Sequence, residues 1–94
     1  MSFTFEWHHV KAKLNVSKHG VEFEEATSVF DDSLGIAIPD PDHSVDEERF
    51  VLTGLSSRKR YLLVTYTERV DKIRIISARQ LTRKEKAEYE DYCK

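Results

Sequence analysis

The sequence has few of the residues that build disulfides, metal clusters and phosphate loops. It contains one cysteine, Cys93, which cannot form an internal disulfide or a four-cysteine zinc site. The lack of a disulfide framework is typical of proteins from a reducing compartment. The three glycines, Gly20, Gly35 and Gly54, stand apart from one another, so the chain has no glycine-rich phosphate loop and no nucleophile elbow. Nucleotide hydrolysis and serine-hydrolase chemistry therefore have no support.

Long apolar segments are also missing. The first six residues lack the basic start and apolar run of a signal peptide, and no stretch approaches the roughly 20 apolar residues of a membrane span. We therefore expect a cytoplasmic protein with no membrane partner. A chain of 94 residues suffices for one hydrophobic core, so residues 1–94 are expected to form a single domain.

Charge is abundant and unevenly distributed. Charged residues make up 34% of the chain and leave a formal net charge of −2. Acidic residues outnumber basic ones in residues 1–56, whereas basic residues outnumber acidic ones in residues 57–94. This separation favours a basic face for a polyanion, although a dipolar surface without a ligand would give the same pattern.

The segment 60–79 organises the rest of the chain, because two runs of β-branched and aromatic residues flank a short charged turn. This pattern predicts a β-hairpin. In a regular second arm the odd-numbered residues from Ile73 alternate with the even-numbered ones, so Arg74 and Arg79 are expected on opposite faces. A hairpin alone is marginally stable in water, so other segments are expected to cover one face and leave the other for a ligand or partner.

A first helix is predicted to begin near Trp7 and to end at Gly20. Trp7, Val10 and Leu14 follow helical spacing and form its apolar stripe, whereas Asn15 falls on another face. Gly20 supplies the left-handed residue with which helices commonly end.

The remaining segments complete an α+β pattern. A brief second helix is predicted over residues 23–30, strands over 34–38 and 49–55, and a final helix from the capping box formed by Thr82 and Glu85. This order predicts N-terminal helices and a C-terminal helix packed on one face of an antiparallel meander sheet of three to four strands.

Arginines are the richest chemical feature of the chain. A guanidinium fork binds phosphate oxygens bidentately and keeps its charge, so arginines clustered on a sheet suit a nucleic-acid backbone. The clustered cations are Arg49, Arg69, Arg74, Arg79 and Arg83, with Lys72 and Lys84 nearby. For any single arginine, pairing with one of the many carboxylates is the competing interpretation.

The histidines are not spaced as metal ligands. His8 and His9 are adjacent, and the four histidines, which include His19 and His43, show neither a His-x-x-x-His nor a His-Glu-x-x-His pattern. We therefore expect neither a bound metal nor another cofactor.

Several blocks of the sequence together resemble the BrnT family of ribonuclease toxins. The resemblance runs from about Phe5 to Tyr89. Its blocks include Phe5-Glu6-Trp7, Lys18-His19-Gly20-Val21, Phe23-Glu24-Glu25-Ala26, Tyr66-Thr67-Glu68-Arg69 and Ile73-Arg74-Ile75-Ile76-Ser77-Ala78-Arg79. The second and the last of these are specific in combination, which makes a chance similarity improbable.

The resemblance implies a RelE-like α+β fold and a toxin that cleaves RNA and so blocks translation. It also implies neutralisation by a BrnA-like antitoxin with a ribbon-helix-helix portion, in a hetero-oligomer that contacts DNA only through the antitoxin. Cleavage in such a family is expected to need no metal, because the ribose 2′-hydroxyl attacks the adjacent phosphate.

That chemistry needs a proton acceptor, a proton donor and cations around the phosphorane-like transition state. We assign the cationic role to Arg49, Arg74 and Arg79, and proton transfer first to Lys18 or His19. Glu48 is the second candidate base, although a carboxylate beside Arg49 could simply be its ion-pair partner. The residues assigned to RNA binding are Tyr66, Arg69 and Arg83.

One departure from the family pattern bears on the backbone. Lys59 stands where a glycine is frequent, and a lysine adopts positive φ less readily than glycine does.

Two other kinds of protein remain compatible with the sequence. The chain could be a nucleic-acid-binding module without catalysis, or an interaction subunit whose basic face is permanently occupied by an acidic or amphipathic partner.

Overall fold

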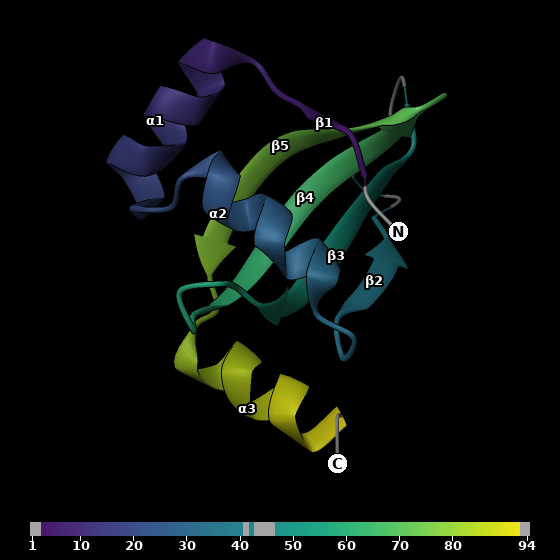
Figure 1. Ribbon diagram of the computed structural model, residues 1–94. Coiled ribbons are helices and arrows are strands. Elements are labelled where there is room, and N and C mark those ends of the chain that lie inside the picture. Colours follow the sequence, from purple (N-terminus) through teal and green to yellow (C-terminus); the bar gives the residue numbers. More distant parts are fainter. Residues whose placement is uncertain (1–2, 41, 43–46, 93–94) are drawn as a thin grey trace.

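A computed structural model describes residues 3–40, 42 and 47–92, and the predictions that involve Cys93 and His43 lie outside this part of the chain. The described residues form a five-stranded sheet with strand order β1-β5-β4-β3-β2 (Figure 1). The strands are β1 (Phe5–Glu6), β2 (Ile36–Pro39), β3 (Arg49–Leu55), β4 (Tyr61–Arg69) and β5 (Lys72–Gln80). The helical segments are α1 (His9–His19), α2 (Phe23–Ser28), the short 3₁₀ segment η1 (Val29–Asp31) and α3 (Arg83–Tyr92).

The sheet is mixed, which corrects the prediction of a purely antiparallel meander with three to four strands. Strands β2 to β5 do form an antiparallel meander. The extended arm before α1 adds β1 in parallel to the edge of β5, with Phe5 opposite Ile73 and Glu6 opposite Arg74. The backbone N–H of Ile73 donates to the Thr4 carbonyl at 2.8 Å, which ties the arm to the hairpin.

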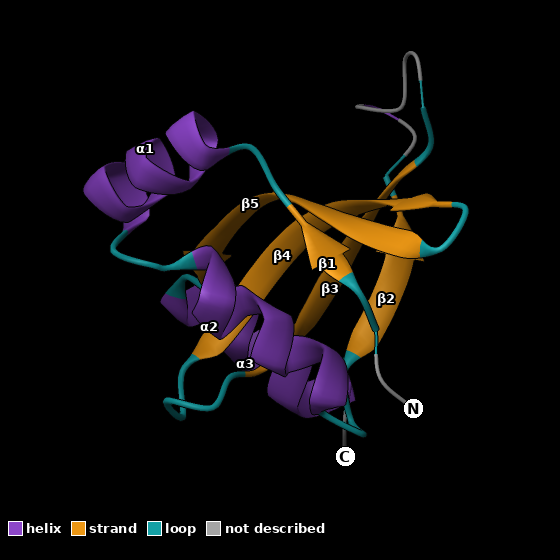
Figure 2. Ribbon diagram, turned by 45° about the horizontal axis from the view of Figure 1, so that its top comes forward, coloured by secondary structure: helices purple, strands orange, loops and turns teal. Residues whose placement is uncertain are grey.

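The apolar core lies between the sheet and the helices α2 and η1 (Figure 2). Phe23, Ala26 and Val29 are fully buried on the helical side, and Leu62 and Val64 are fully buried on β4. Burial of these side chains is the main source of stability for a small domain. The predicted apolar positions of the hairpin are therefore confirmed.

The predicted apolar stripe of α1 is wrong beyond Trp7. Val10 and Leu14 are 58% and 62% exposed, whereas Asn15 is only 6% exposed. The Asn15 amide is buried because it binds backbone groups of β5 and of the segment after the helix, as described below. The predicted helix end is confirmed, since Gly20 adopts φ +68° and its N–H donates to the Val16 carbonyl at 2.8 Å.

A β-bulge in β5 changes which residues share a face. Thr65 lies opposite Ser77, but the next residue of β4, Tyr66, lies opposite Ile75, so Ile76 is an extra residue. Arg74 and Arg79 pair with Thr67 and Leu63, which are four residues apart on β4 and therefore on the same face. The prediction that Arg74 and Arg79 point to opposite faces is wrong, because regular alternation stops at the bulge.

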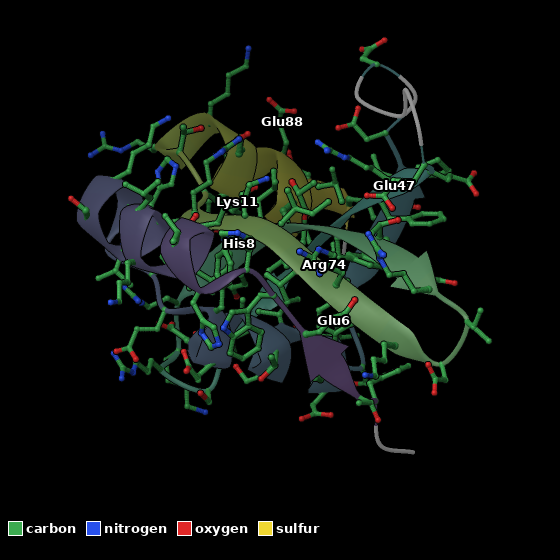
Figure 3. The ribbon with its side chains drawn as sticks, turned by 90° about the horizontal axis from the view of Figure 1, so that it is seen from above. Glu6, His8, Lys11, Glu47, Arg74 and Glu88 are labelled. Atoms are coloured by element: carbon green, nitrogen blue, oxygen red, sulfur yellow. The ribbon has the colours of Figure 1, made fainter. Side chains whose placement is uncertain are left out.

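Helix α3 lies on the face of the sheet opposite α2, so the prediction that all helices share one face is also wrong. Figure 3, seen from above, shows α2 and α3 on opposite sides of the strands. The Tyr89 ring of α3 contacts the Tyr61 ring at a centroid distance of 5.6 Å, and its hydroxyl donates to the Leu34 carbonyl at 2.9 Å. The capping box is confirmed, since the Glu85 carboxylate accepts from Thr82 N–H and the Thr82 hydroxyl accepts from Glu85 N–H.

A buried ion pair joins α2 to the turn before β4. The Arg60 guanidinium donates two hydrogen bonds to the Glu25 carboxylate, and the Ser56 hydroxyl donates a third at 2.7 Å. These hydrogen bonds, of which those from Arg60 have the largest effect, hold the pKa of Glu25 below its ordinary value, although burial acts to raise it. Within the same turn Lys59 adopts φ +64°, the conformation for which glycine is best suited.

No helix among the described residues is long and apolar enough to span a membrane.

Candidate functional site

The face of the sheet opposite α2 carries α3 over the start of β4, and the same face, here called the open face, carries a row of polar side chains across four strands near the end of β4. Glu6 on β1 lies opposite Arg74 on β5, Arg74 opposite Thr67 on β4, and Thr67 opposite Arg49 on β3. We call these four residues the arginine row. Since adjacent strands are about 4.8 Å apart, the backbone positions of the row span about 14 Å. Two arginines thus stand on one surface with the small Thr67 side chain between them.

The ionic contacts of Arg74 and of the neighbouring Arg69 are long. Arg74 Nη1 lies 3.5 Å from Glu6 Oε2, and Arg69 Nε lies 3.7 Å from the same oxygen. Arg69 Nη2 lies 3.3 Å from Glu47 Oε2, on the other side of Arg69. Figure 3 shows Arg74 between Glu6 and Glu47. These separations exceed those of a good charge-assisted hydrogen bond, so an anion can compete for the guanidinium groups of Arg74 and Arg69.

Thr67 fixes the segment that leads into β3. Its side chain is buried, and its hydroxyl donates to the Glu48 carbonyl at 2.7 Å. The Glu48 backbone is therefore held against β4, while the residue as a whole is exposed. The structure places Glu48 directly before Arg49, beside the row.

Arg79 shares the open face but has a different environment. Its Nη1 and Nη2 atoms donate to the two Glu85 oxygens at 2.7 and 2.9 Å, a bidentate pair. The Arg79 guanidinium and the Thr82 N–H lower the pKa of Glu85 to about 2. Arg79 lies four residues along the sheet from Arg74 in the β4 register, or about 13 Å. It is therefore tightly paired and separate from the row.

Lys18 and His19 lie at the other end of the molecule from the row. They form the last turn of α1, and the Arg60 guanidinium donates to the carbonyl of the next residue, Gly20, at 3.2 Å. Arg60 precedes β4, whereas Thr67 lies near its end, a separation of about 20 Å along the strand. Their placement fits the favourable interaction of cations with a helix C-terminus.

The three residues assigned to RNA binding have different surroundings. Tyr66 is buried on the α2 side, where its ring meets Phe30 and Phe50 at centroid distances of 5.0 and 5.5 Å. Burial raises the pKa of its hydroxyl. Arg69 is exposed beside the row, and Arg83 is exposed in the first turn of α3. The Tyr66 ring is thus part of the core and does not face a ligand.

Sequence reasoning assigned no role to Glu6 or Thr67, and it named Glu47 as one of the carboxylates that could pair with the arginines, as Glu47 does with Arg69. Glu6 could have been found, because it alternates with the apolar residues Phe5 and Trp7 and so had to point away from the core. Its position beside Arg74 depends on the parallel pairing of β1 with β5, which a two-residue strand does not reveal. Among residues 3–40, 42 and 47–92, no three His, Cys, Asp or Glu side chains gather as a possible metal site.

The fold and the row of arginines define a small α+β protein with a surface suited to phosphate groups. A model for the ribonuclease toxin of type II toxin-antitoxin systems, BrnT, matches residues 7–85. The match covers most of the chain, which therefore belongs to the BrnT family. A type II toxin family implies an antitoxin partner.

The fold is also similar to a solved structure, the crystal structure of the Brucella abortus ribonuclease toxin BrnT. The TM-score is 0.68 with 16% sequence identity, and the match covers 87% of this chain and 100% of the other. At this level of identity the likeness shows a common fold. No curated protein matches the sequence. The resemblance stated from the sequence is confirmed at the level of the family.

Proposed function

We propose that this chain is an endoribonuclease toxin that cleaves RNA without a metal ion and thereby inhibits translation. Membership of the BrnT family supports the ribonuclease class. The observation that carries the proposal is the arginine row, which presents Arg49 and Arg74 on one open surface with Arg69 beside them. Such a surface can bind an RNA backbone and stabilise the charge that develops at the cleaved phosphate.

The two arginines of the row have the cationic role in this proposal. Arg74 is held by long contacts and Arg49 stands two strands away in the same row, so a phosphate can bind the Arg74 guanidinium on the side that faces Arg49. Arg69 and Arg83 extend RNA binding on either side, and Arg79 contributes a third cation if Glu85 moves away from it. Lys18, His19 and Glu48 remain candidates for proton transfer, of which only Glu48 adjoins the row.

The antitoxin is proposed to be a BrnA-like protein with a ribbon-helix-helix portion. It would form a hetero-oligomer with the toxin in the cytoplasm, and this complex would contact DNA only through the antitoxin. Helix α1 offers a suitable surface, because Val10 and Leu14 are exposed and its charged residues are all basic. An acidic amphipathic segment would complement this surface.

A second function is compatible with the same surface. Long ion pairs on an exposed sheet can supply affinity for a polyanion without any proton transfer. A nucleic-acid-binding module without catalysis is therefore the alternative, and an assay for strand scission separates the two.

The test uses purified, antitoxin-free protein incubated with a labelled RNA in an excess of chelator. We expect cleavage by the natural protein and a loss of at least about 100-fold in the Arg74→Ala variant. Arg58→Ala is the matched control, because Arg58 is exposed and pairs with Glu22 at 3.4 Å in the turn before β4. RNA that stays intact with folded protein, alone and with added ribosomes, would contradict the proposal, and cleavage that stops only with chelator would contradict its metal independence.

A further inference from the structure

Glu6 is the carboxylate at the β1 end of the arginine row. It is the direct neighbour of Arg74 across the β1–β5 pair and lies on the same face. Its backbone is fixed by the parallel pairing of β1, and the adjacent Phe5 ring packs against Phe30 at a centroid distance of 5.1 Å. Because neighbouring residues of a strand point to opposite faces, this packing directs Glu6 outward over the row.

The two oxygens of Glu6 are used differently. The closest ionic contact with Arg74 and the closest with Arg69 both involve Oε2. Oε1 makes no hydrogen bond with any residue of the described ranges 3–40, 42 and 47–92, whereas Oε2 accepts one from Arg74 at 3.5 Å. The carboxylate is about one-third exposed, so Oε1 can accept a proton from a group that binds beside Arg74.

This environment contrasts with that of Glu85. Both oxygens of Glu85 accept short hydrogen bonds from Arg79, and one also caps α3. A carboxylate held in this way stabilises the fold, because both of its oxygens already accept hydrogen bonds. The long contacts of Glu6 hold the side chain near the phosphate-binding arginine without occupying its proton-accepting oxygen.

We infer that Glu6 is the general base of the cleavage reaction, an assignment that rests on the proposed ribonuclease function. Glu6 Oε1 takes the proton of the ribose 2′-hydroxyl while the 2′-oxygen forms a bond to the adjacent phosphorus. The bond from phosphorus to the 5′-oxygen breaks, and that oxygen takes a proton from solvent water. The resulting hydroxide recovers the proton from Glu6, which leaves a 2′,3′-cyclic phosphate and a 5′-hydroxyl end.

The charges that face Glu6 come from each neighbouring element. Arg74 belongs to β5 and Arg69 to β4, and Glu47 before β3 reaches Arg69 from the far side. His8 follows two residues later on the same segment. When a phosphate binds the arginines they remain close to Glu6, so the base and the electrostatic stabilisation act on the same phosphodiester.

The test compares Glu6→Gln with Glu22→Gln, which makes the same change in the exposed ion pair with Arg58 at the other end of β4. Single-turnover cleavage of saturating labelled RNA is measured between pH 4 and 8, and binding is measured with a 2′-O-methyl RNA that cannot be cleaved. We expect Glu6→Gln to cleave at least about 100-fold more slowly, to bind within threefold of the natural protein, and to lose the rise of rate with pH in the acidic range. Glu22→Gln should match the natural protein.

The outcomes distinguish the role of Glu6 from the ribonuclease function itself. Equal cleavage and an unchanged pH profile in Glu6→Gln would overturn the role of Glu6 and leave the ribonuclease function intact. Absence of cleavage by the folded natural protein would overturn both. If Glu6→Gln is unfolded by circular dichroism, Glu6→Asp decides, since a base moved back by one methylene should slow cleavage while keeping the acidic pH dependence. A Glu6→Asp variant that cleaves as fast as the natural protein would contradict the inference.

Discussion

The side-chain amide of Asn15 pairs with both backbone groups of Ala78, as a neighbouring strand would. Its Nδ2 donates to the Ala78 carbonyl at 2.8 Å, and its Oδ1 accepts from the Ala78 N–H at 3.1 Å. The same Nδ2 donates to the Val21 carbonyl at 2.9 Å. One buried amide thus satisfies the backbone groups of β5 at the edge that the short β1 does not cover, and it holds the end of α1 against the sheet.

Replacing Asn15 with alanine should destabilise the fold by about 3 kcal/mol, because three buried backbone groups lose their partners. The control is Ser17→Ala, which changes an exposed position of the same helix and should leave stability within about 0.5 kcal/mol. Urea unfolding followed by circular dichroism measures both. A loss below about 1 kcal/mol in Asn15→Ala would mean that water replaces the amide at little cost.

Glu85 should make the fold sensitive to acid. Its pKa is lowered from 4.5 to about 2 in the folded protein, chiefly by the hydrogen bonds from Arg79. A lowered folded-state pKa contributes stability that is fully present above pH 4.5 and is lost as the pH falls toward 2. Since the side chain is one-third exposed, solvent screening reduces this contribution to on the order of 1–2 kcal/mol.

The measurement compares unfolding of the natural protein and Glu85→Gln at pH 6 and at pH 3. Glutamine can still close the capping box, so the helix start is retained. We expect the difference in stability between the two proteins to shrink at pH 3, and the Arg79→Ala variant to show the same reduced sensitivity. A difference that is constant with pH would contradict the role of the Arg79–Glu85 pair.

Lys59 should be replaceable by glycine with a gain in stability. Its φ of +64° costs a residue with a Cβ about 1 kcal/mol relative to glycine, partly offset by the greater freedom of glycine in the unfolded chain. We expect Lys59→Gly to raise the free energy of unfolding by up to about 1 kcal/mol. Lys59→Ala removes the same charge but keeps the Cβ, and should show no gain. Equal effects in the two variants would assign the change to charge.

Arg79→Ala should spare the fold and abolish toxicity when the protein is produced in growing cells. The lost ion pair is partly exposed and is worth on the order of 1 kcal/mol, and Glu85 still caps α3. Growth after induction is the measurement, with Arg58→Ala as the control for loss of a surface arginine. Toxicity equal to that of the natural protein would remove Arg79 from the site.

Much of the fold could be predicted from the periodicity of apolar residues and from the residues that cap helices. The predictions that failed have local causes. The strong alternation of residues 61–66 predicted the face of β4 correctly, and Thr82 with Glu85 predicted the start of α3. Asn15 was assigned to the wrong side of α1, because periodicity counts a polar residue as exposed and cannot see the unpaired edge of β5 that its amide satisfies.

The candidate site was harder to predict than the fold. The arginines themselves were identified from their clustering, but their grouping depends on contacts between distant segments. Glu6 meets Arg74 only because β1 is parallel to β5, and Arg79 joins the open face only because Ile76 is extra. Lys18 and His19 were assigned to proton transfer and were therefore expected near the arginines. No local sequence pattern shows that α1 ends at the opposite end of the sheet.

The bulge at Ile76 decides how β5 would respond to the loss of one residue. A single deletion inside a regular strand exchanges the two faces for all later residues. Deleting Ile76 would instead place Ser77 directly after Ile75, so that Ser77 stays opposite Thr65, Ala78 opposite Val64 and Arg79 opposite Leu63. The bulge would disappear, while the contacts of Ala78 with Asn15 and of Arg79 with Glu85 would be kept. Tolerance to the deletion of one residue should therefore be higher at Ile76 than at Val64 in the regular middle of β4.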